Sequence, residues 1–109
     1  MEKKEMATCT APGHSSCTIT CPNGCIALYY EPNGPCRTSC SGSAVLDIDA
    51  SQKFSVQISD MPATDLEKAI GPSLGATIQS ALKASSKSVS LSLQSVGVKE
   101  LTDAIKGAI

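Results

Sequence analysis

Cysteine is the residue type in this chain with the most chemistry to offer. The chain has 109 residues, and its six cysteines all lie within the first 40 positions: Cys9, Cys17, Cys21, Cys25, Cys36 and Cys40. Three residues separate Cys21 from Cys25, three separate Cys36 from Cys40, and an Asn-Gly turn sequence accompanies each pair. Four thiolates on two such loops can surround a Zn²⁺ ion tetrahedrally. The spacing therefore predicts a zinc site formed by Cys21, Cys25, Cys36 and Cys40.

The only histidine of the chain, His14, lies in the same segment, between Cys9 and Cys17. Thiolate sulfur and imidazole nitrogen are the usual zinc ligands in proteins. Cys9, His14 and Cys17 are therefore a second candidate set of metal ligands, which one of the other thiols would complete.

Disulfide bonds are the alternative use of these cysteines. The number of cysteines is even, and the surrounding segment is rich in Thr, Ser, Gly and Pro, with Glu31 and Arg37 as its only full charges between residues 6 and 43. Such a segment buries too little apolar surface to offset the entropy of ordering, so a covalent or coordinate bond must hold it. Sequence alone does not choose between zinc and disulfides, nor among the pairings.

Catalytic chemistry has little support in the sequence. A Cys–His nucleophile would have to use His14, which lies among several competing thiols. Asp47 and Asp49 are two residues apart, a spacing that puts both on one face of a strand, and we interpret them as a solvated face. The prediction is a protein without enzymatic activity.

Composition excludes several classes of partner. The formal net charge is −1, only 17% of residues are charged, and 3% are aromatic. Nucleic-acid binding and attachment to a membrane surface both need clustered positive charge, and none is present. No apolar run approaches the ~18 residues that a membrane span requires. A protein is therefore the expected partner, and pairing with a second copy of the chain stays open.

The cysteine-rich module, residues 9–43, is expected to follow a polar tail over residues 1–8. Within the module, residues 17–21 and 26–30 are rich in β-forming residues and predict two short strands. The Asn-Gly sequences at Asn23 and Asn33 predict tight turns. Tyr29 and Tyr30 point to opposite faces of their strand, so one of them should be exposed unless something covers it. The predicted binding surface consists of Asn23, Tyr29, Tyr30 and Asn33.

The second part of the chain, residues 44–109, shows clear periodicity. Apolar residues alternate with polar ones over residues 46–49 and 54–59, which predicts a hairpin with one buried face, and over residues 88–94, which predicts a third strand. An apolar residue recurs at every fourth position from Leu66 to Leu82, which predicts a helix, and Gly71-Pro72 predicts a break in it. A closing helix is predicted over residues 98–109. The fold class is therefore α+β, with the cysteine-rich module followed by a two-layer ββαβα domain.

These features together predict a small non-enzymatic binding or adaptor protein whose module is held by zinc or disulfides. The two alternatives are a protein that stores or senses zinc and a secreted, disulfide-rich, inhibitor-like domain. No apolar stretch typical of an export signal follows Met1, so a cytoplasmic location is expected. A secreted or periplasmic location is expected instead if such a signal has been removed.

Overall fold

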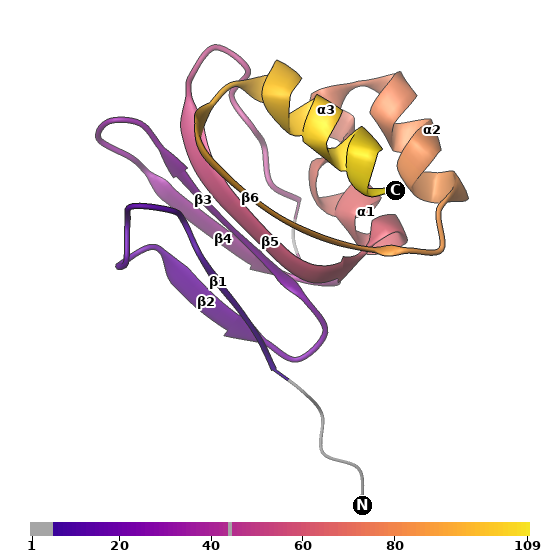
Figure 1. Cartoon of the computed structure of the whole chain (residues 1–109), viewed down its shortest axis with the longest axis horizontal. Coiled ribbons are helices and arrows are strands. Elements are labelled where there is room, and N and C mark those ends of the chain that lie inside the picture. Colours follow the sequence, from indigo (N-terminus) through magenta and orange to yellow (C-terminus); the bar gives the residue numbers. More distant parts are fainter. Residues whose placement is uncertain (1–5, 44) are drawn as a thin grey trace, which may run out of the picture.

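The computed structural model describes residues 6–43 and 45–109 and shows three layers. A two-stranded sheet, a four-stranded sheet and a group of three helices follow one another from left to right in Figure 1. The predicted α+β class is confirmed.

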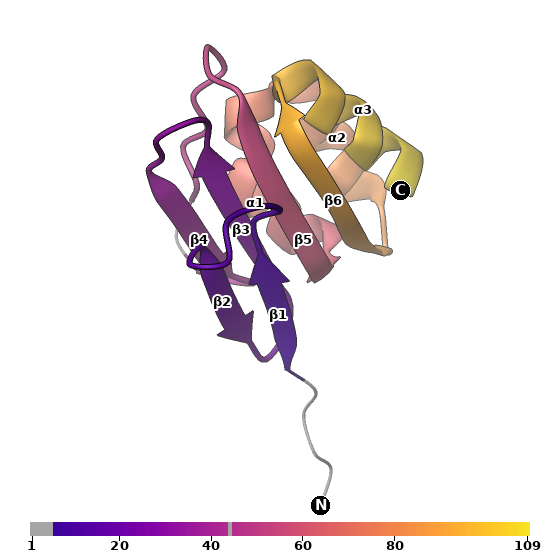
Figure 2. The same cartoon turned by 60° about the vertical axis from the view of Figure 1, so that its left-hand side comes forward.

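The four-stranded sheet is antiparallel throughout and has the order β4-β3-β5-β6. Its strands are β3 (Cys25–Tyr30), β4 (Cys36–Cys40), β5 (Phe54–Pro62) and β6 (Ser88–Val96). Strands β3 and β4 come from the cysteine-rich segment, whereas β5 and β6 come from the rest of the chain. The predicted boundary near residue 43 therefore falls between strands of one sheet (Figure 2).

A β-hairpin covers part of the sheet face that the helices leave open. Its strands are β1 (Ala7–Thr10) and β2 (Thr18–Cys21), and β1 begins within the segment expected to be a polar tail. Strand β1 lies over β3 and β5, and β2 lies over β3 and β4. Cys9 and Cys21 point inward and form a small second core with Cys25 and Ala27.

The helices are α1 (Ala63–Leu74), α2 (Ala76–Ala84) and α3 (Val98–Ala108). The apolar stripe that predicted α1 and α2 is largely buried, but the break falls at Gly75 and not at Gly71-Pro72. Gly75 has φ +96° and ψ 169°, a non-helical conformation that glycine adopts readily and other residues rarely do, so it separates the two helices. Pro72 lies inside the last turns of α1.

The structure differs from the prediction over residues 46–49, which form no strand. The alternation nevertheless marks burial correctly, because Leu46 and Ile48 are buried. The backbone of this segment bonds to α1: Leu46 N–H donates to the Ala69 carbonyl at 2.7 Å, and the Ser73 hydroxyl bonds to both Leu46 and Ile48. The alternation of apolar and polar residues therefore marked an extended segment that packs on a helix, and not a strand that pairs with other strands in a sheet.

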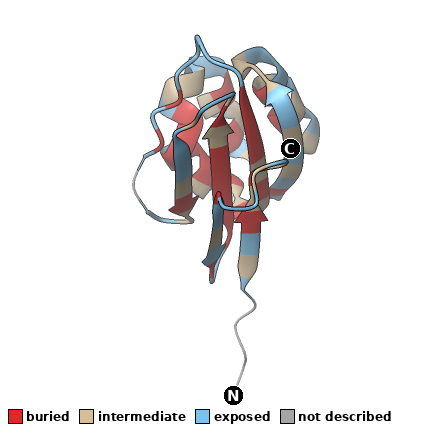
Figure 3. Cartoon of the chain, turned by 90° about the vertical axis from the view of Figure 1, so that its left-hand side faces the viewer, coloured by how far each residue is buried: buried red, intermediate tan, exposed pale blue. Residues whose placement is uncertain are grey.

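The main core lies between the four-stranded sheet and the helices (Figure 3). Its largest fully buried side chains are Phe54, Ile26, Leu28, Ile58, Met61, Leu66, Ile70, Ile78, Leu82, Leu101, Ile105 and Val56. Strand β5 is covered on both faces, so its successive side chains enter two different layers. Val56 and Ile58 enter this core, whereas Gln57 and Ser59 face the hairpin, where their side chains bond to the β1 backbone.

Candidate binding site

The six cysteines form three disulfides, each joining the hairpin or its turn to the sheet. The bridges are Cys9–Cys25, Cys17–Cys36 and Cys21–Cys40, with Cα–Cα distances of 5.9, 5.6 and 5.5 Å. Strand pairing fixes the cysteines of β3 and β4 opposite those of the hairpin at a separation typical of disulfides.

The prediction of zinc is therefore wrong. Cys21, Cys25, Cys36 and Cys40 are all bonded to other sulfurs, and a disulfide sulfur is not the thiolate that zinc needs. In the second candidate set Cys9 and Cys17 are also bridged, and His14 contacts Glu31. Residues 6–43 and 45–109 contain no group of ligand side chains that could hold a metal ion.

The disulfides also bear on location. Structural disulfides persist in oxidising compartments and are rare in the cytoplasm. The bridges therefore favour an oxidising environment over the expected cytoplasmic one. In the described part of the chain, no helix has both the length and the apolar character to cross a membrane.

The residues of the predicted binding surface do not come together. Tyr30 is only 4% exposed, and its hydroxyl accepts a hydrogen bond from Asp49 N–H at 2.7 Å. Tyr29 is half-buried and stacks on the His14 ring, with centroids 3.7 Å apart. Asn23 and Asn33 are exposed, but one precedes β3 and the other follows it, so the two turns lie at opposite ends of that strand.

His14, Glu31 and Ser55 form a hydrogen-bonded cluster that sequence reasoning missed. His14 Nε2 lies 2.6 Å from Glu31 Oε2, and the Ser55 hydroxyl donates to the same oxygen at 2.8 Å. The hydrogen bond from Ser55, followed by that with His14, holds the pKa of Glu31 below its usual range. Ser55 and His14 each bond to the Glu31 carboxylate, and no hydrogen bond joins Ser55 to His14 among the described residues. A base that activates a nucleophile bonds to it directly, so this cluster is not arranged as a base and its serine nucleophile. The cluster fastens the hairpin turn to β3 and β5.

No protein-family model, curated protein or solved structure matches this chain. A function must therefore be assigned from the side chains and surfaces of the chain itself. The surface feature that we consider is a groove.

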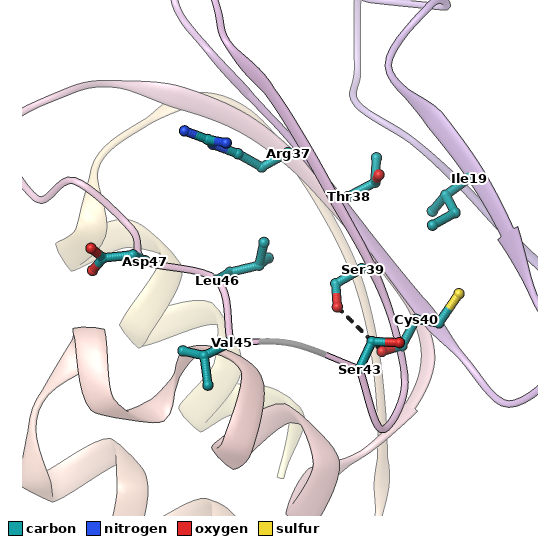
Figure 4. Close-up of a pocket in the computed structure, with 9 residues that line it drawn as sticks. All are labelled: Ile19, Arg37, Thr38, Ser39, Cys40, Ser43, Val45, Leu46 and Asp47. Atoms are coloured by element: carbon teal, nitrogen blue, oxygen red, sulfur yellow. Dashed lines mark hydrogen bonds between the residues drawn. The ribbon is translucent and has the colours of Figure 1, made fainter.

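A groove of about 530 Å³ runs beside β4; we call it the β4 groove. It is lined by Ile19, Arg37, Thr38, Ser39, Cys40, Ser43, Val45, Leu46 and Asp47. Figure 4 shows Ile19 of the hairpin on one side of β4, with Val45, Leu46 and Asp47 on the other. The volume is within the range of roughly 300–1,000 Å³ typical of ligand sites.

The free edge of β4 contributes backbone groups to this groove. Tyr30 N–H donates to Pro35 O, and Ser41 N–H donates to Gly24 O. In an antiparallel ladder, residue pairs that exchange backbone hydrogen bonds alternate with pairs that do not. Counting from these two contacts, Arg37 and Ser39 are at bonded positions and pair with β3. The N–H and C=O of Thr38 therefore point away from β3, toward the edge.

The groove contains one cation, Arg37, and one anion, Asp47, both on the side of β4 away from Ile19. Arg37 is the only arginine of the chain and is exposed. His14 and Glu31 are the only pair within ion-pair distance among the described residues, so no described carboxylate pairs with Arg37. Val45, 58% exposed, is one of only two large apolar side chains described as exposed. The sequence signal for this site was slight: Arg37 is one of two charges in a charge-poor segment.

Proposed function

We propose that this chain is a secreted, disulfide-rich binding domain that recognises a protein partner and catalyses no reaction. The observation that carries the proposal is the pairing of all six cysteines into bridges that clamp the hairpin onto the sheet. Cross-links of this kind serve small domains outside the cytoplasm, where they compensate for limited burial.

The layer that the bridges hold has little core of its own. Its buried cluster consists of Cys9, Cys21, Cys25 and Ala27, so most of its buried apolar atoms belong to disulfides and small side chains. This layer supplies Ile19 to the β4 groove, and its Cys21 is bonded to Cys40 of β4, which also lines the groove. The bridges thus keep a binding surface rigid, which lowers the entropy cost of association.

Binding by the oxidised and the reduced chain tests the proposal. The native protein, collected from an oxidising secretory host, should have an intact mass lower than that of the reduced chain by one hydrogen per cysteine. Immobilised oxidised protein should select displayed extracellular domains or peptides that bind saturably. Affinity for a selected ligand should fall at least about tenfold, ~1.4 kcal/mol, after reduction and alkylation. Free thiols in the native protein, or equal binding by the alkylated chain, would contradict the proposal.

A further inference from the structure

We propose that the β4 groove binds an extended peptide segment, which adds a strand to the edge of β4 and places one carboxylate on Arg37. The inference rests on the proposed binding function and names the class of partner and the surface that receives it. Three independent features carry it: the edge of β4, which is unpaired among the described residues, the apolar side chains of Ile19 and Val45 on its two sides, and the Arg37 guanidinium, which pairs with no described carboxylate.

The backbone gives the first step. Strand β4 ends the sheet, and the outward N–H and C=O of Thr38 have no partner among the described residues. Such an edge is a template for an added strand, and its main-chain hydrogen bonds supply affinity. Farther along β4, the Cys40 carbonyl already accepts a hydrogen bond from Ser43 N–H at 3.0 Å. The open stretch of edge therefore centres on Thr38.

The walls of the groove give the second step. Cys36 and Cys40 bond to the hairpin, so Thr38, which alternates with them, faces the hairpin side where Ile19 lies. Arg37 faces the opposite side, with Val45. Because side chains of an added strand also alternate, the peptide residue opposite Thr38 would pack toward Ile19. Its two neighbours would face Val45 and Arg37, so apolar residues are expected opposite Ile19 and Val45.

Charge complementarity gives the third step. A guanidinium offers a planar fork of donors that matches a carboxylate, and Arg37 has no such partner in the described structure. Asp47, on the same side of β4 as Arg37, repels a second acid in the same groove. The partner is therefore expected to carry a single Asp or Glu, positioned at Arg37, with apolar residues opposite Ile19 and Val45.

The shape of the groove favours a peptide over a second copy of this chain. The edge of β4 is recessed between Ile19 and the segment at Val45–Asp47 (Figure 4). Two such edges placed together would leave both hollows unfilled, at the cost of the contacts that close packing provides. A single extended peptide fills the hollow and reaches the edge.

A panel of synthetic peptides tests the inference on the oxidised, full-length protein. Each blocked peptide of about seven residues alternates valine and threonine, and one glutamate is moved through every position; a matched panel carries glutamine. Binding is measured by fluorescence anisotropy, and amide hydrogen exchange is followed at Thr38. The best glutamate peptide should bind at least about tenfold more tightly than its glutamine counterpart and should protect the Thr38 amide. No binding tighter than about 1 mM by any peptide, or equal binding by the two panels, would overturn the inference.

Variants identify the groups involved. Arg37→Gln should remove the preference for glutamate, and Asp47→Asn should strengthen binding of the glutamate peptide. Lys99→Gln removes a positive charge from α3 in the helix layer and is the matched control. It should change neither the preference for glutamate nor the affinity for the glutamate peptide. Thr38→Pro removes the outward N–H without removing a bond to β3 and should abolish binding. If that variant does not fold, methylating the peptide amides one at a time tests the complementary hydrogen bond on the unchanged protein. It removes the peptide N–H that would donate to the Thr38 carbonyl and should abolish binding at one position.

Three further outcomes are informative. Self-association that Thr38→Pro abolishes, without peptide binding, would make the edge an interface between copies and overturn the inference. If ligands selected by the oxidised chain bind Arg37→Gln and Thr38→Pro as well as the unchanged protein, the binding function stands and this site is wrong. If the oxidised chain selects no ligand at all, the proposed function itself fails.

Discussion

At the scale of single residues, Glu31 joins three parts of the molecule. Its Oε2 atom contacts His14 of the hairpin turn and Ser55 of β5, while Ser95 N–H donates to the Ser55 hydroxyl at 3.1 Å. These hydrogen bonds favour the ionised carboxylate and lower the pKa of Glu31. Protonating Glu31 should therefore loosen the attachment of the hairpin turn.

The sign of the resulting pH dependence follows from this lowered pKa. Ionised Glu31 stabilises the fold fully above its ordinary pKa of 4.5, and the contribution is lost as the pH falls through the lower folded value. We expect Glu31→Gln to be less stable than the unchanged protein at neutral pH and the difference to shrink on acidification. Urea unfolding of both proteins between neutral and strongly acidic pH measures it. A constant difference across this range would contradict the prediction. Asp49, whose pKa is lowered chiefly by the Ser51 hydroxyl, contributes to the acid loss that both proteins share.

Gly24 is a second residue whose position allows a sharp test. It has φ +118°, and a Cβ atom there would lie 2.6 Å from the Asp60 carbonyl oxygen. Gly42 also has a positive φ, +86°, but nothing lies within 4 Å of its Cβ position. Gly42→Ala therefore measures backbone strain alone, and Gly24→Ala adds the steric clash.

We expect Gly24→Ala to lower the free energy of unfolding by at least about 1–3 kcal/mol and by clearly more than Gly42→Ala. Urea unfolding at one pH compares the two variants. Equal losses would show that β3 can shift away from Asp60 and would remove the argument for a close approach at this turn.

At the scale of elements, the hairpin depends on its bridges more than on its contacts. Removing Cys17–Cys36 with the double substitution Cys17→Ser and Cys36→Ser opens a loop of sequence separation 19 and leaves the other two bridges in place. We expect a loss of about 3 kcal/mol in the free energy of unfolding, because loops of this length gain that much unfolded-state entropy. Denaturation of the oxidised variant measures the loss. A variant as stable as the parent would mean that the bridge adds no constraint to the fold.

Elements with strong periodicity could be predicted from the sequence, and those defined by distant partners could not. Apolar and polar residues alternate along β5 and β6, and apolar residues line one side of α3. Each pattern indicates an element with one buried face. Strand β4 has the sequence Cys-Arg-Thr-Ser-Cys, which carries no apolar alternation, and it exists because β3 and the hairpin hold it on two sides. Residues 46–49 alternate like a strand, but Leu46 and Ile48 form hydrogen bonds with α1 instead of with a neighbouring strand.

The candidate site was harder to predict for the same reason. The six cysteines identify a cross-linked segment, but the choice between zinc and disulfides depends on which sulfurs face each other after the strands pair. The β4 groove depends on strand order, which puts β4 at an edge and Val45 beside it. Neither fact is local, so Arg37 looked like an isolated charge.

At the scale of the whole molecule, the two cores share strand β3. Ile26 and Leu28 enter the main core beneath the helices, whereas Cys25 and Ala27 enter the smaller core beneath the hairpin. The hairpin, the sheet and the helices are therefore mechanically linked through one strand. Loss of the hairpin layer should expose one face of β3 and weaken the sheet on which the helices pack.

Reduction of all three disulfides tests this linkage. Each bridge closes a loop worth about 3 kcal/mol, and because the loops overlap, we expect a total loss of about 6–9 kcal/mol. A domain of this size is stable by only about 5–15 kcal/mol, so the reduced chain should be marginal and should unfold in one transition. Far-ultraviolet circular dichroism reports the helices, and hydrogen exchange reports the hairpin amides; both should change at the same urea concentration in the reduced, alkylated protein. Helices that persist after the hairpin has lost all protection would show that residues 44–109 hold their structure without the layer that the disulfides attach.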